Sequence, residues 1–320
     1  MSLLALIAAL LLEQFHPLSS RKYLFGWLLS YVNFFQLHFN AGQRKHGRIA
    51  WLIAVLPLLA GVVVLYDLLY RVHPLFAWMF NVLVLYLTMG FRQFSHFFSD
   101  IHLALRMGKL DEARSLLSRW RGMPLHELNA EEIARVTIEQ GLIASHRNVF
   151  GVIVWFVLFS VLGAGGAAGA LLYRLGQFLR THWGSKNKSE LDQFGEFARQ
   201  AFYLLEWLPI RLTAMTFAIV GDFEDTVYCW RTQAANWPDP EAGILLASGA
   251  GALGVLLGMP IPQACPDRSR RGGVLEDRAE LGIGDDADTE FMQSTIGLMW
   301  RAVAFWLILL LLLTLANLLG

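Results

Sequence analysis

The stretch that decides the fold is Ala302–Leu319, AVAFWLILLLLLTLANLL, close to the end of a chain of 320 residues. It carries no charge, and its 18 residues are just enough for a helix to cross a hydrocarbon core of about 30 Å. Trp300 and Trp306 lie at its start, where aromatic side chains gather at a membrane–water interface. We therefore predict a C-terminal transmembrane helix over residues 297–320.

Two more apolar stretches, Ala50–Tyr70 and Leu75–Phe91, are separated by only a short polar link. This spacing predicts a helical hairpin over residues 50–91, within an N-terminal group of membrane helices that covers residues 1–91. Only 16% of the residues are charged, against about a quarter in soluble domains. Composition and patterning together predict an all-α fold, a polytopic membrane protein with about 4–6 membrane-embedded helices.

A glycine-rich segment, GAGGAAG at residues 163–169, interrupts the apolar run Asn148–Tyr173. Each glycine costs a helix about 1 kcal/mol relative to alanine. The run is therefore either one helix with a small-residue packing face or two half-helices that meet as a re-entrant hairpin. Basic residues lie on both sides of the run, before it at Arg106, Lys109, Arg114, Arg119, Arg121 and Arg135, and after it at Arg174, Arg180, Lys186, Lys188 and Arg199. Since the positive-inside rule assigns both flanks to the cytoplasm, we favour the hairpin, within a membrane-embedded core over residues 148–259.

Two segments are polar. Residues 92–147 are predicted to be a cytoplasmic helical segment, with an amphipathic helix that ends before Gly122 and a second helix that begins with a capping box of Asn129 and Glu132. Residues 260–296 are predicted to be a polar, mobile loop. The expected location is the bacterial inner (plasma) membrane, which the chain crosses several times.

Few motifs indicate chemistry. The formal net charge is zero, so we expect no nucleic acid as a partner. The expected partners are the lipid bilayer and a membrane or cytoplasmic protein. No phosphate-binding loop or metal-ligand spacing is present, and the residues alone predict no cofactor. Asp285 and Asp286 are weak candidates for a Mg²⁺ site, and a solvated acidic loop is the alternative. Cys229 and Cys265 lie far apart and are expected to stay reduced.

The most informative stretch is LEWLPIRLTA at residues 205–214, which places an acid, a proline and an arginine inside an apolar helix. Arg211 is permanently charged, so it must pair with a carboxylate from another segment or contact an anionic ligand or lipid headgroup. Glu206 lies five residues before it, which is a poor spacing for a pair on one helix.

This stretch carries a resemblance. Residues 207–212, WLPIRL, resemble the W-[IVL]-P-x-R-L signature of the superfamily that contains CobD/CbiB and AmpE. Residues 108–114, GKLDEAR, are similar to its G-D-L-x-x-A-R motif. Trp155, the glycines and Tyr173 resemble its F-W-x-x-x-G-G…Y segment, and residues 249–258 resemble an A-G-A-L-G-V-x-L-G run. The motifs follow in the same order along most of residues 1–300.

The resemblance implies one of two functions. CobD/CbiB enzymes join adenosylcobyric acid to aminopropanol or its phosphate in cobalamin synthesis, at the cost of ATP, whereas AmpE is thought to be a sensory modulator. The enzymes carry a GRDT-like motif, an E-x-x-x-E-N-x-x-D-G motif and an aspartate pair before the signature. Here residues 121–124 read RGMP, only Glu139 remains of the acids in the second motif, and Phe202-Tyr203 replaces the pair. The opening residues 12–14 and the segment 218–221 resemble AmpE.

The resemblance therefore implies a non-catalytic, AmpE-like membrane protein that senses or scaffolds. The alternative is a divergent adenosylcobinamide-phosphate synthase, which would need ATP and Mg²⁺. The candidate ligand-binding residues implied by the matched motifs are Arg211, Tyr173, Asp111, Arg114 and Glu139.

Overall fold

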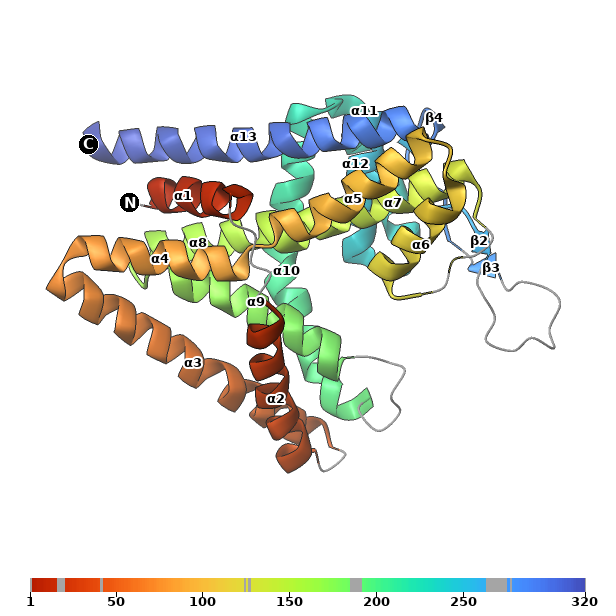
Figure 1. The fold of residues 1–320 in the computed structure, drawn as a ribbon. Helices are drawn as coiled ribbons and strands as arrows, with labels where there is room; N and C mark the ends of the chain where they lie inside the picture. Colours follow the sequence, from red (N-terminus) through yellow and green to blue (C-terminus); the bar gives the residue numbers. More distant parts are fainter. Residues whose placement is uncertain are drawn as a thin grey trace. The chain divides into compact units, whose positions relative to one another are not determined.

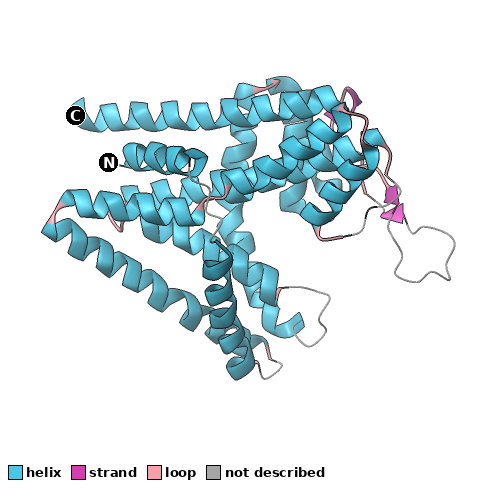
Figure 2. Cartoon of the chain, viewed as in Figure 1, coloured by secondary structure: helices cyan, strands magenta, loops and turns pink. Residues whose placement is uncertain are grey.

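A computed structural model of the chain describes residues 2–15, 21–40, 43–123, 125, 128–184, 192–262, 275–276 and 278–319. Nearly all of these residues are helical (Figures 1 and 2). The chain divides into two compact units, Met1–Gly90 with Asn148–Pro209 and Phe91–Arg147 with Ile210–Gly320. The predicted all-α fold is confirmed.

The first unit contains the helices α1 (Ser2–Phe15), α2 (Arg21–Phe39), α3 (Arg44–Val72), α4 (Pro74–Thr88), α8 (Gly151–Val161), α9 (Gly166–Trp183) and most of α10 (Asp192–Val220). The predicted hairpin is formed by α3 and α4, which Figure 1 shows as two long helices joined at one end. His73 separates them, and its imidazole accepts a hydrogen bond from the backbone N–H of Leu75 at 3.1 Å. Pro74 occupies the first helical position, where a missing N–H costs nothing.

The glycine-rich segment forms a turn between two helices, so the apolar run is not one continuous helix. The re-entrant path of the hairpin through the membrane stays a prediction. α8 ends at Val161, the turn contains Gly163 and Gly165 with positive φ angles of 76° and 79°, and α9 begins at Gly166. Gly169 brings α9 against α8, because a Cβ there would lie 2.0 Å from the carbonyl oxygen of Trp155. The side of the membrane on which the hairpin opens stays a prediction.

Asn81 of α4 closes the N-terminus of α9. Its buried side-chain oxygen accepts a hydrogen bond from the backbone N–H of Ala167 at 3.1 Å. The first N–H groups of a helix have no partner within the helix, and an unmet donor is costly in an apolar environment. The asparagine therefore makes it possible for a helix to begin in the middle of an apolar run.

The second unit contains α5 (Phe91–Arg106), α6 (Leu110–Arg121), α7 (Ala130–Ser145), α11 (Phe223–Gln233), the 3₁₀ turn η3 (Ala234–Asn236), α12 (Pro240–Leu253) and α13 (Thr289–Leu319). A short π-helical stretch, η1 (His146–Phe150), follows α7 and leads into α8. Two predictions are confirmed here: Gly122 ends α6 with a φ of 71°, and Asn129 and Glu132 form the capping box of α7.

The region after α12 differs from the predicted polar loop over residues 260–296. β1 (Val255–Leu256) pairs in parallel with β4 (Asp285–Asp286), β2 (Ile261–Pro262) pairs antiparallel with β3 (Leu275–Glu276), and α13 begins at Thr289. Buried Leu281 anchors the returning segment through two backbone hydrogen bonds to Leu257. Asp288 then caps α13 by accepting from two backbone N–H groups. The basic part of the predicted loop, and Cys265, lie outside the described residues.

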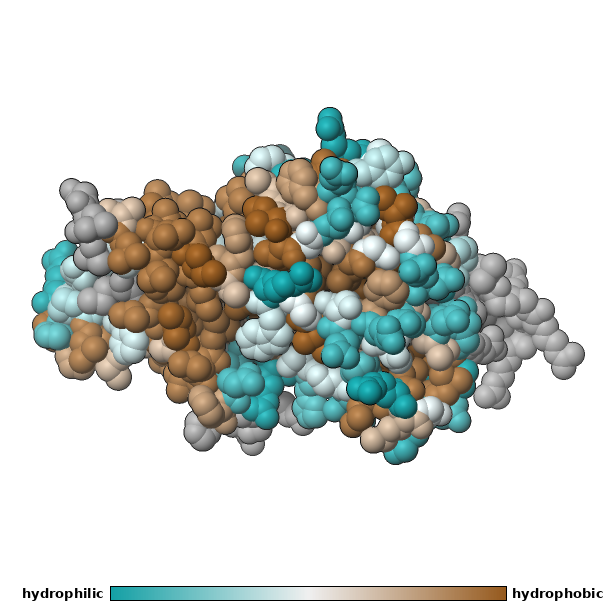
Figure 3. Space-filling model, turned by 90° about the horizontal axis from the view of Figure 1, so that it is seen from above, coloured by the Kyte–Doolittle hydropathy of each residue, from teal (hydrophilic) through white to brown (hydrophobic). Residues whose placement is uncertain are grey.

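Four helical runs among the described residues are long and apolar enough to cross a membrane: Arg44–Val72, Ala130–Val161, Gln193–Val220 and Thr289–Ala316. The C-terminal half of α13 exposes leucines, among them Leu311, Leu312 and Leu313. Apolar side chains also cover a broad area of the face drawn in Figure 3. The chain is therefore a multi-pass α-helical membrane protein.

One of these runs crosses a predicted boundary. The sequence predicts that the cytoplasmic segment ends at residue 147, but α7, η1 and α8 follow without a break from Ala130 to Val161. Most of this run is buried inside the protein rather than exposed. Arg135 and Glu139 of this run are buried in the protein, and charged residues inside a membrane-length helix commonly face protein in this way.

Candidate functional site

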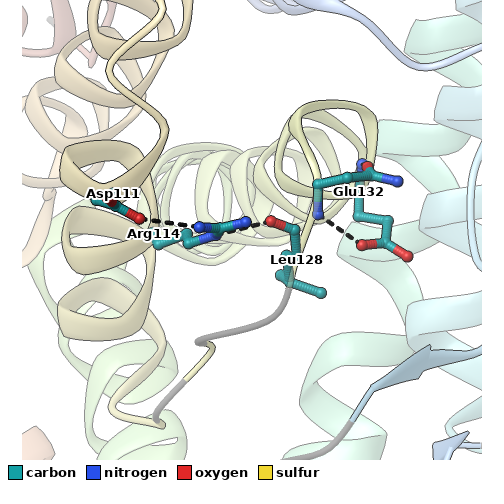
Figure 4. A network of polar contacts seen from close by, with 5 residues as sticks. Asp111, Arg114, Leu128 and Glu132 are labelled. Atoms are coloured by element: carbon teal, nitrogen blue, oxygen red, sulfur yellow. Dashed lines mark hydrogen bonds and ion pairs between the residues drawn. The ribbon is translucent and has the colours of Figure 1, made fainter.

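Asp111 and Arg114 lie together on α6 (Figure 4). The Arg114 guanidinium donates to the Asp111 carboxylate at 2.9 Å and to the carbonyl oxygen of Leu128 at 2.8 Å. The Asp111 side chain is 97% exposed, whereas that of Arg114 is 24% exposed. These contacts tie α6 to the start of α7, beside a shallow hollow of about 460 Å³ that is lined by Asp111, Arg114, Ser115, Ser118, Arg119, Gly122 and Met123. A ligand-binding role for the two residues stays a prediction.

Glu139 lies on α7 and is buried in an ion pair with Arg278. Its second carboxylate oxygen accepts a hydrogen bond from the backbone N–H of Gly258 at 2.8 Å. The guanidinium of Arg278 also lies over the ring of Trp237, 5.0 Å from the centroid. Both oxygens of Glu139 are therefore engaged by segments that lie more than a hundred residues further along the chain.

Arg135 precedes Glu139 by one helical turn, and its side chain is buried as well. Its Nη1 atom lies 2.7 Å from the sulfur of Met259. Neither Arg135 nor Arg278 is among the residues that the sequence motifs singled out. The signal for Arg135 was its i, i+4 spacing to Glu139 inside an apolar helix, whereas no local pattern marks Arg278.

Arg211 lies on α10, half-buried, two residues after Pro209. Pro209 has no N–H, so the carbonyl of Leu205 lacks its helical donor, and the indole N–H of Trp155 donates to that carbonyl instead at 3.0 Å. Glu206 pairs with Arg180 of α9 at 3.0 Å, which agrees with the poor spacing between Glu206 and Arg211. Whether Arg211 binds a ligand or a lipid stays a prediction.

Tyr173 is a fully buried residue of α9. Its ring packs against Phe202, with centroids 5.5 Å apart, and closely over Gly151. The resemblance aligns Phe202 with an aspartate of the enzymes. In the structure the guanidinium of Arg180 lies 5.2 Å from the Phe202 ring centroid. Phe202 is therefore held by aromatic and cation–π packing.

Asp285 and Asp286 are both exposed on β4. Successive residues of a strand point to opposite faces, so these two carboxylates do not converge on one ion. Among the described residues, no group of three or more His, Cys, Asp or Glu side chains is placed to hold a metal.

Cys229 on α11 is free and buried. Burial, followed by the negative charge of Asp225, raises the pKa of its thiol to about 11. The thiol is therefore protonated at neutral pH and is a poor nucleophile.

Comparison with known proteins matches residues 3–282 to the family described as CobD/Cbib protein. A protein of Stutzerimonas stutzeri (strain A1501) named cobalamin biosynthesis protein CobD is 34% identical over 96% of each chain. One of the same name from Chromobacterium violaceum is 35% identical over 80% of this chain and 72% of its own. Cobalamin biosynthesis protein CbiB of Salmonella typhimurium is 26% identical over 89% of this chain and 88% of its own. No solved structure matches. The chain therefore belongs to the CobD/CbiB family.

Proposed function

We propose that the chain is a non-catalytic, AmpE-like member of its family that senses or scaffolds in the bacterial inner membrane. The observation that carries this proposal is the state of Glu139. It is the one acid that remains of the family's acidic motif, and both of its oxygens are bound, one by Arg278 and one by the Gly258 N–H. A carboxylate that is buried in an ion pair is not available to hold Mg²⁺ on a nucleotide.

The other acidic candidates, all among the described residues, do not fit a magnesium–ATP site either. Asp111 is exposed and paired with Arg114, and Asp285 and Asp286 point to opposite faces of a strand. Residues 92–147 and the hairpin of α8 and α9 are the proposed surfaces for a membrane or cytoplasmic protein partner, and the lipid bilayer surrounds the apolar helices.

A second function is favoured by a separate observation, the similarity over nearly the full length to a protein named cobalamin biosynthesis protein CobD. On that basis the chain would act in cobalamin biosynthesis, as a divergent adenosylcobinamide-phosphate synthase. It would join adenosylcobyric acid to aminopropanol or its phosphate with ATP and Mg²⁺.

Complementation separates the two functions. The chain is expressed in a corrinoid auxotroph that lacks its synthase, and growth is measured with cobyric acid as the corrinoid source. We expect no growth, although immunoblotting shows the chain in the membrane fraction and an authentic synthase restores growth. Growth that is restored by the chain and abolished by Glu139→Ala would contradict the non-catalytic function and support the synthase.

A further inference from the structure

The cluster around Glu139 contains more positive than negative charge. Arg135, Arg278 and Glu139 are 8%, 5% and 6% exposed, so two guanidinium groups and one carboxylate are buried, and the carboxylate pairs with Arg278. No carboxylate among the described residues pairs with Arg135. Buried charges are costly unless they are compensated, and arginine does not lose its proton in proteins.

The two arginines also hold donors that no described residue satisfies. Arg135 Nε and Arg278 Nη1 are buried and have no acceptor among the residues that the structure describes. The one contact of Arg135 Nη1 is the Met259 sulfur at 2.7 Å, and a thioether is a weak acceptor. Among the residues that the structure describes, the cluster therefore has more donors than acceptors, and an acceptor with several oxygens would balance it.

The backbone beside these donors has an unusual conformation. Gly258 has a φ of 79° and Met259 a φ of 61°, and Met259 is the one non-glycine with a positive φ among the described residues. A side chain in the left-handed region is strained by about 1–3 kcal/mol, and such residues cluster at ligand-binding positions. Met259 is half-exposed, so the cluster lies close to the surface of its unit.

We propose that Arg135 and Arg278 form a binding site for a phosphate group. Guanidinium groups bind phosphate with two parallel hydrogen bonds, and a phosphate offers the oxygens and the negative charge that the cluster lacks. One oxygen would replace the Met259 sulfur as the acceptor of Arg135, and another would accept from Arg278 Nη1. The phosphate comes from a soluble molecule or from a lipid headgroup, and the site does not require catalysis by the chain.

The test is a measurement of thermal unfolding on the purified full-length chain. In one arm inorganic phosphate is added in detergent, with sodium chloride at equal ionic strength as the reference. In the other arm the chain is placed in phosphatidylcholine nanodiscs with or without phosphatidic acid. A ligand at about 100 times its Kd is expected to raise Tm by about 5 °C in one of the two arms, which identifies the source of the phosphate.

Arg135→Met distinguishes a ligand site from a structural arginine. The variant removes an uncompensated buried cation, so without phosphate its Tm is expected to equal or exceed that of the parent chain, and the response to phosphate is expected to disappear. Arg301→Met, at an exposed arginine of α13, is the control and keeps the response. The proposal is overturned by the absence of a rise in both arms, by an equal rise in Arg135→Met, or by a large loss of Tm in that variant without phosphate.

Discussion

At the residue scale, one side chain supplies a hydrogen-bond donor that another residue lacks. The clearest pair is Pro209 and Trp155, because the proline removes a helical donor and the indole replaces it. Both belong to motifs that resemble the family, at positions 54 residues apart in the sequence. The pair shows that residues of two separate motifs are linked through the hydrogen bonding of one helix.

Glu139→Gln tests the buried ion pair at the residue scale. The substitution leaves the Arg278 charge buried without a counter-charge, so we expect the free energy of unfolding to fall by about 3–5 kcal/mol. Thermal or denaturant unfolding in detergent measures this change. The double variant Glu139→Gln with Arg278→Met should recover much of the loss. If the double variant were less stable than the single one, the charge imbalance would not be the cause.

Cys229 gives a prediction for pH dependence. A raised pKa means that the folded protein favours the neutral thiol, so the thiolate fraction grows tenfold per pH unit until it approaches a pH of about 11. Alkylation by iodoacetamide should therefore be slow at pH 7–8 and rise steeply above pH 9. The measurement uses a Cys265→Ser background, so that only Cys229 is labelled. A reaction plateau near pH 8 would contradict the raised pKa.

At the scale of elements, the hairpin of α8 and α9 depends on a close approach of two helices. Gly169→Ala places a Cβ 2.0 Å from the Trp155 carbonyl oxygen, so the helices must separate, and we expect a loss of about 1–3 kcal/mol in the free energy of unfolding. Gly61→Ala in α3 is the matched control, because nothing lies within 4 Å of its Cβ. The control should be neutral or stabilising, and equal losses in both variants would rule out helix packing as the cause.

The elements that could be predicted from the sequence are those with local signals. Three of these signals lie within a short stretch of sequence: the uncharged run of α13, the glycine that ends α6 and the capping box of α7. The strand β4 could not be predicted, because it has two residues and exists only through its pairing with β1. The pairing of Glu139 with Arg278 was missed for the same reason, since its partners lie 139 residues apart.

At the scale of the whole molecule, the basic residues predict which side of the membrane each segment faces. The ends of the α8–α9 hairpin are flanked by basic residues on both sides, so we expect them to face the cytoplasm. Reporter fusions after Arg121 and after Trp183 should therefore both give a cytoplasmic signal. A fusion after His73, between α3 and α4, should give a periplasmic one. Opposite signals from Arg121 and Trp183 would contradict the re-entrant arrangement.

The cap that Asn81 places on α9 also bears on the order in which the chain is made. The ribosome produces Asn81 86 residues before Ala167, so the acceptor is already present when the glycine-rich segment emerges. Glu139 is different, because its partner Arg278 is synthesised 139 residues after it. A ribosome-bound chain truncated near residue 210 should therefore already hold a capped hairpin, while its Glu139 still lacks its counter-charge.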